Sequence, residues 1–169
     1  MPSIASPNGL APVNHPSGVV RPFAMTILTG YASTIYQNSP VKIVPSSTGE
    51  GTIALATAGD ADGVIGTFQG VEFTDSDGRR RVSNKWTASQ AATDIVAYVT
   101  IDQSITYQIQ SNAALAVADI GKQYDFTAPA GNTTTGLSSQ ALDVASVVTS
   151  GGTAQLRLIG IVSGPDNNW

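Results

Sequence analysis

The residues that could perform chemistry are concentrated in an acidic stretch between positions 60 and 77. Its carboxylates are Asp60, Asp62, Glu72, Asp75 and Asp77. Two acids at a set separation are sufficient for glycoside hydrolysis, so this stretch is where an enzyme would first be sought. Most of these acids lie in glycine-flanked turns, where aspartate is favoured because its side chain bonds the local backbone. We therefore predict turns here rather than a catalytic pair.

A calcium loop is the second chemistry that this stretch resembles. The run Asp75-Ser76-Asp77-Gly78 begins like an EF-hand loop, but the fifth position is Arg79 and the twelfth is Trp86, where an acidic or amide ligand and a glutamate are needed. Asp-Gly between two strand-forming runs instead predicts a β-hairpin turn. We predict no metal and no cofactor.

Nucleophilic and metal chemistry have few residues to draw on. The chain has no cysteine and a single histidine, His15. A catalytic serine needs a base within hydrogen-bond reach. The chain offers three lysines, of which only Lys42 follows a serine in a Ser-x-x-Lys arrangement, Ser39-Pro40-Val41-Lys42. These counts exclude thiolate sites and multi-histidine sites, and they predict that the protein is not an enzyme.

One basic cluster stands out. Arg79, Arg80, Arg81 and Lys85 make up half of the eight lysines and arginines. One interpretation is a solvated hairpin tip balanced by Asp75 and Asp77. The other is a contact with an anionic partner surface, namely acidic side chains of another subunit. The net charge of −4 and the lack of an aromatic stacking series argue against nucleic acid as the partner.

Composition places the chain among globular proteins with an unusually uncharged surface. Its 169 residues fit one domain with room for an extra arm. Charged residues are 12% of the chain, about half the usual share, so serine, threonine, asparagine and glycine must cover the surface. Such a surface suits static contacts with other proteins. No apolar run approaches the roughly 18 residues of a membrane span, so no membrane partner is expected.

From position 23 onward, β-branched and aromatic runs alternate with turn residues, which is typical of a sandwich or barrel. The runs predict strands at 23–28, 35–37, 41–44, 52–56, 64–73, 79–86, 95–101, 105–110, 123–126, 141–148 and 154–162. Strands 95–101 and 105–110 are expected to pair with each other. The fold class is thus all-β, a compact antiparallel barrel or sandwich, with at most one or two short helical turns within 112–122. Barrel and sandwich remain open.

Residues 1–22 differ from this body because they hold five of the nine prolines. We predict an extended N-terminal arm over 1–22, with little strand pairing of its own, and a single β domain over 23–169. Candidate partner-binding residues in the arm are Leu10, Pro12, Val13 and His15. Deleting residues 2–20 is expected to leave the body folded. Trp169, a large apolar side chain at the end of the sequence, either folds back or anchors in a neighbouring subunit.

The order of several segments resembles the head decoration, or cement, proteins of tailed phages. These segments are Gly9-Leu10-Ala11-Pro12-Val13, the run 63–75 leading to Lys85-Trp86, Tyr107–Gln110, Ala118–Lys122, Gly131–Ser138 and the closing 156–167. The resemblance implies a non-enzymatic protein of the virion that binds the outer surface of the phage head as a homotrimer. It also implies an arm that reaches the major capsid protein or a neighbouring decoration trimer, and a shell stabilised by these contacts.

Two alternatives stay open. A glycan- or receptor-binding β module is suggested by the Asn/Thr-rich loop 128–136, although aromatic platforms are scarce and Trp86 is the candidate to test. A structural subunit of the phage tail or neck would have a similar composition.

Overall fold

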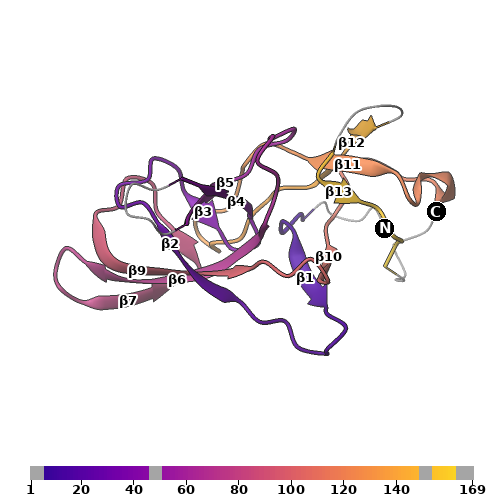
Figure 1. Ribbon diagram of the computed structural model, residues 1–169. Coiled ribbons are helices and arrows are strands. Elements are labelled where there is room, and N and C mark those ends of the chain that lie inside the picture. The colour runs from indigo at the N-terminus through magenta and orange to yellow at the C-terminus, as the bar shows by residue number, and fades with distance from the viewer. Residues whose placement is uncertain (1–5, 46–50, 149–153, 163–169) are drawn as a thin grey trace.

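The computed structural model describes residues 6–45, 51–148 and 154–162, and these residues confirm the all-β prediction. The body is a closed five-stranded β-barrel, which decides between barrel and sandwich (Figure 1). Around the barrel the strand order is β4–β5–β2–β9–β6, and a β4–β6 pairing closes it. The pairs are antiparallel except β2–β5, which is parallel, so the prediction of an antiparallel barrel is wrong for this pair. The strands are β2 (Phe23–Ile27), β4 (Pro40–Val44), β5 (Thr52–Leu55), β6 (Gly66–Asp75) and β9 (Ala92–Thr100).

Apolar residues fill the barrel because successive side chains in a strand point to opposite faces. The long strand β6 departs from this regular alternation. Phe68 and Val71 are three positions apart, which would place them on opposite faces of a regular strand, yet both are fully buried. A register shift between Phe68 and Gly70 inserts the extra residue that turns both side chains inward. Phe73 then meets the buried Trp86 edge to face at 5.7 Å.

The predicted hairpin of the acidic stretch is confirmed. β6 pairs with β7 (Arg80–Ser83) across the turn at Gly78, whose φ of 72° is the left-handed value that glycine adopts freely. β7 lies at the edge of the sheet. Two short strands, β3 (Ile35–Tyr36) and β8 (Lys85–Trp86), pair beside the barrel.

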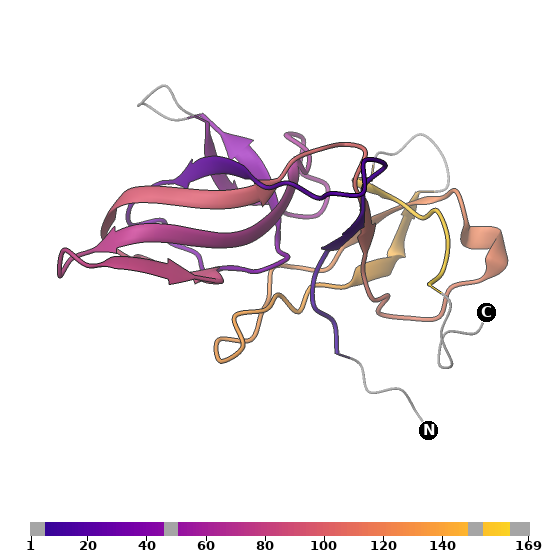
Figure 2. The same cartoon turned by 90° about the horizontal axis from the view of Figure 1, so that it is seen from below.

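A smaller sheet lies at one end of the barrel (Figures 1 and 2). It consists of β12 (Leu142–Val148), β11 (Gln123–Phe126) and β13 (Leu156–Arg157). Before it in the sequence lies η1 (Val117–Asp119), the single 3₁₀ turn among the described residues, which agrees with the predicted one or two short helical turns within 112–122. The last strand is much shorter than the predicted 154–162, because β13 pairs only with Gln123 and Tyr124. In the described part of the chain, no helix is both long and apolar enough to cross a membrane.

Two sequence-based predictions about pairing are wrong, and one cause explains both. β9 does not pair with β10 (Thr106–Gln108), because β2 and β6 already occupy both edges of β9. The free edge of β10 pairs instead with β1 (Ala11–Asn14). The expectation of an arm with little pairing of its own is therefore wrong for Ala11–Asn14. Both views show β1 between the barrel and the small sheet.

Candidate partner-binding surface

The N-terminal stretch divides into two parts, the first of which is the arm root, residues 9–14. Leu10 is only 3% exposed, and its backbone N–H donates to the Asn38 carbonyl at 2.9 Å. Gly9 has a φ of 76°, and a Cβ added there would lie 2.4 Å from the same carbonyl oxygen. Leu10 is thus part of this chain's own interior, which corrects its assignment as a partner-binding residue. Pro12 pairs with Tyr107 and is half-buried, and Val13 is 52% exposed.

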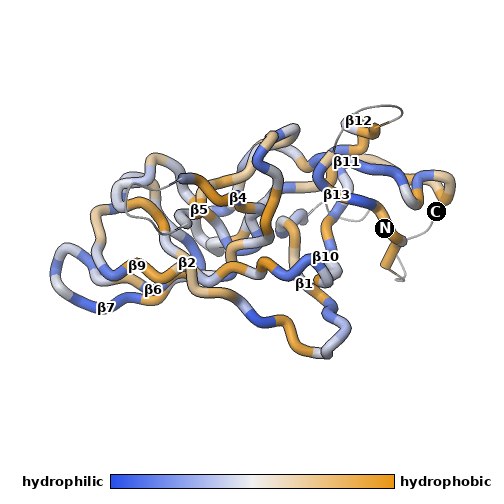
Figure 3. Tube along the Cα trace, in the orientation of Figure 1, coloured by the Kyte–Doolittle hydropathy of each residue, from blue (hydrophilic) through white to orange (hydrophobic). Residues whose placement is uncertain are grey.

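The second part is the arm loop, residues 15–22, which connects β1 to β2. Val19 is 52% exposed, and Phe23, at the end of the loop, is 58% exposed. Figure 3 shows apolar stretches in this loop, which protrudes from the body. Large apolar side chains on one protruding segment mark an interaction site more strongly than the same residues scattered singly.

His15 fastens the arm loop to the body. Its Nε2 lies 3.0 Å from Asp102 Oδ2, while its Nδ1 accepts a hydrogen bond from the Ser17 backbone N–H at 3.1 Å. Because Nδ1 is an acceptor in this arrangement, Nε2 carries the proton and donates to the carboxylate. Asp102 is held in turn by the Ser104 backbone N–H at 2.7 Å from Oδ1. That bond, followed by the Ser104 hydroxyl and His15, keeps the pKa of Asp102 below its usual value.

A hollow of about 410 Å³ lies beneath this fastening, and we call it the arm-loop hollow. It is lined by His15, Ser17, Val19, Arg21, Phe23, Asp102 and Ile105. Ile105 is buried and forms an apolar floor, whereas the exposed Arg21 makes no ion pair with any described residue. The hollow can receive an apolar side chain that has a carboxylate beside it. The sequence pointed to His15 and Val13 but not to Val19, Arg21, Phe23 or Asp102.

The basic hairpin tip is mostly neutralised within the chain. Arg80 pairs with Glu72, whose pKa is lowered chiefly by this contact, and Arg80 also donates to the Asp94 carbonyl. Arg81 lies 2.6 Å from Asp75, whose pKa is lowered first by the Ser76 backbone N–H. Of the three arginines at this tip, only Arg79 has a guanidinium that makes no ion pair or hydrogen bond to the described residues. The geometry therefore fits the balanced-tip interpretation for Arg80 and Arg81 and leaves one free cation.

The two tryptophans offer no exposed platform in the described residues. Trp86 is fully buried, so it belongs to the core and cannot stack on a sugar. Trp169 lies outside the described residues.

The acidic residues Asp60 and Asp62 both contact Lys42. The hydrogen bond from Lys42 to Asp60 is the main reason why the pKa of Asp60 is lowered. Across 6–45, 51–148 and 154–162, no group of three or more acidic, histidine or cysteine side chains is arranged to hold a metal ion.

Comparison with known proteins gives no relative on which to base a function. No protein-family model matches the chain, and neither a curated protein nor a solved structure matches it.

Proposed function

We propose that this chain is a non-enzymatic structural protein that binds the outer surface of a tailed-phage head as a trimer and stabilises the shell. The observation that carries the proposal is the arm loop, which presents Val19 and Phe23 to solvent while one of its ends is paired with β10 and the other with the barrel strand β9. The contact partner is the major capsid protein or a neighbouring trimer. The order of segments in the sequence supplies the rest of the proposal.

The arm loop suits such a contact because it is preorganised. Ordering a free loop on binding costs roughly 0.5–1.5 kcal/mol for each immobilised flexible side chain. Here the β1–β10 ladder and the His15–Asp102 contact have already fixed the loop. Apolar anchors then bind without most of that cost, and many symmetry-related copies on a shell add avidity.

The first test is the copy number of the chain in purified particles, measured by quantitative mass spectrometry against the major shell protein. A ratio near one, or several hundred copies per particle, supports placement on the head lattice. A handful of copies would move the protein to the tail or neck. Its absence from particles would overturn the proposal.

A second test separates the arm loop from the rest of the surface. The double variant Val19→Ser/Phe23→Ser should keep its melting temperature and bind shells that lack the protein at least tenfold more weakly. Val82→Ser is the matched control, because Val82 is 78% exposed on β7, away from the arm loop. Unchanged binding of the double variant would contradict the role of the arm loop, and so would equal losses in both proteins.

A further inference from the structure

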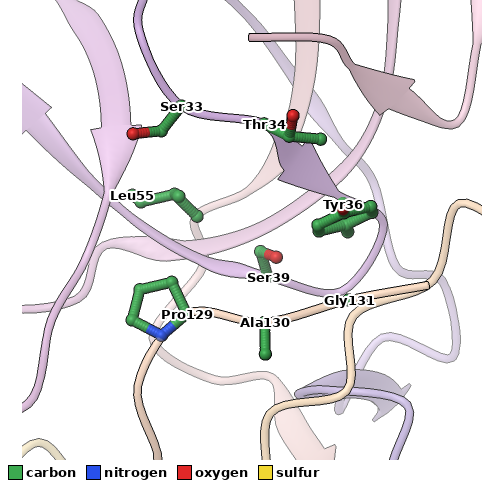
Figure 4. A pocket seen from close by; sticks show the side chains of 8 residues that line it. All are labelled: Ser33, Thr34, Tyr36, Ser39, Leu55, Pro129, Ala130 and Gly131. Atoms are coloured by element: carbon green, nitrogen blue, oxygen red, sulfur yellow. The ribbon is translucent and has the colours of Figure 1, made fainter. Parts of the chain in front are cut away.

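A second hollow, unrelated to the arm loop, lies where the barrel meets the loop at 127–137 (Figure 4). Its volume is about 480 Å³, within the roughly 300–1,000 Å³ typical of ligand pockets. It is lined by Ser33, Thr34, Tyr36, Ser39, Leu55, Pro129, Ala130 and Gly131. None of these side chains is charged.

The hollow is formed before any ligand arrives, because hydrogen bonds join its two walls. Gln37 forms a parallel bridge with Leu137, and the Gln37 N–H donates to Gly136 at 2.9 Å. Within the loop, the Asn132 side chain accepts from the N–H groups of Thr134 and Thr135. The walls are therefore held by backbone contacts, and closing on a ligand requires little ordering.

Tyr36 and Gly131 fix the shape of the hollow. A Cβ at position 131 would lie 2.2 Å from the Tyr36 ring, so only glycine lets the ring lie this close to the loop. In Figure 4, Tyr36 and Pro129 flank Ser39. The aromatic ring and the pyrrolidine give the hollow apolar surfaces on either side of a hydroxyl.

Ser39 is the observation that points to a ligand. The residue is 1% exposed and lines the hollow, and its hydroxyl makes no hydrogen bond to any residue that the structure describes. A hydroxyl at the wall of a hollow can both donate and accept a hydrogen bond. A ligand that brings its own hydroxyl groups would satisfy it.

We propose that this hollow binds a neutral saccharide ring. The absence of charged lining residues disfavours phosphates, carboxylates and cations, whose burial requires a compensating charge. A sugar instead combines hydroxyl groups, suited to Ser39, Ser33 and Thr34, with a C–H face suited to Tyr36 and Pro129. This inference goes beyond shell binding, because the hollow shares no residue with the arm loop.

The test is the binding of the full chain to an array of immobilised neutral oligosaccharides, followed by saturation-transfer NMR with the free sugars that score. Ser39→Ala should weaken binding about three- to tenfold, the loss expected for one uncharged hydrogen bond. Ala130→Phe should abolish binding, because residue 130 is exposed and lines the hollow. Ala61→Phe, at an exposed turn outside the hollow, is the matched control and should bind like the unaltered protein.

Absence of binding to every neutral sugar, in both the array and the NMR experiment, would overturn the proposal. Equal binding by Ala130→Phe, or equal loss in Ala61→Phe, would also overturn it. Binding to immobilised polymer but not to free sugar would assign the site to a polysaccharide. Shell binding by Ala130→Phe should be unchanged, so this result is independent of the arm-loop test.

Discussion

The arm root and the arm loop are adjacent parts of one proline-rich stretch, yet the structure uses them in opposite ways. The root buries Leu10 and pairs with β10, whereas the loop exposes Val19 and ends at the exposed Phe23. The difference shows that proline content marks an irregular segment without indicating whether that segment is buried.

The difference between root and loop also changes the design of a deletion variant. Removing residues 2–20 would take away β1 and Leu10, so the expectation of a folded body after this deletion is not supported. A deletion within residues 16–21 would test the arm loop without removing β1 or Leu10.

The largest expected effect is at Leu10. Leu10→Ala should lower the free energy of unfolding by about 2–5 kcal/mol, because it leaves a cavity where a buried side chain was. Val13→Ala is the matched control in the same strand and should change stability by less than about 0.5 kcal/mol. Urea unfolding of both variants measures the difference. Similar values would remove the distinction between buried and exposed residues of the root.

Gly9→Ala should have the next largest effect. The left-handed φ and the approach to Asn38 together predict a loss of about 1–3 kcal/mol. Gly18→Ala, in the arm loop, tests the other side of the comparison, since its φ is similar but open space surrounds it. The Gly9 variant should therefore be the less stable of the two in urea unfolding. The reverse order would show that the contact with Asn38 is absent in solution.

Loss of the His15–Asp102 contact should affect the loop rather than the body. His15→Ala should leave the melting temperature within a few degrees of the original, because a single hydrogen bond to a carboxylate that is 48% exposed contributes little. Cleavage of the loop after Val19 or Val20 by elastase should become faster, and this can be followed by mass spectrometry. An unchanged cleavage rate would mean that the loop is held by other contacts.

The smallest expected effect is the pH dependence of stability that comes from Asp102, whose pKa is lowered chiefly by the Ser104 backbone N–H. The pKa of Asp102 is lowered in the folded protein, so its ionised form stabilises the folded state above the unfolded value of about 3.9. As the pH falls through the lowered folded value, the unfolded chain has already taken up the proton and this contribution is lost. Asp102→Asn should therefore lose less melting temperature than the original protein between pH 6 and pH 2.5. Identical acid profiles would contradict the assignment.

The sequence by itself determined the class of fold and most of the strands. Alternation of β-branched residues predicted β2, β4, β5, β6 and β9 to within a few residues, because burial of one face of a strand imposes a period of two. The Asp-Gly turn predicted the β6–β7 hairpin, because that turn geometry requires a positive φ. These signals are local, so they can be read without knowing which strands are neighbours.

Only the tertiary structure decided which strands pair and which polar groups meet. β10 pairs with β1 rather than with β9, because β2 and β6 occupy both edges of β9. No local sequence pattern encodes which strands occupy those edges. Asp102 came to His15 across 87 positions, and Ser39 came to the loop at 129–131 in the same way. Folding brought these distant segments together, so the sequence did not predict the arm-loop hollow, and of the uncharged hollow it indicated only the loop 128–136.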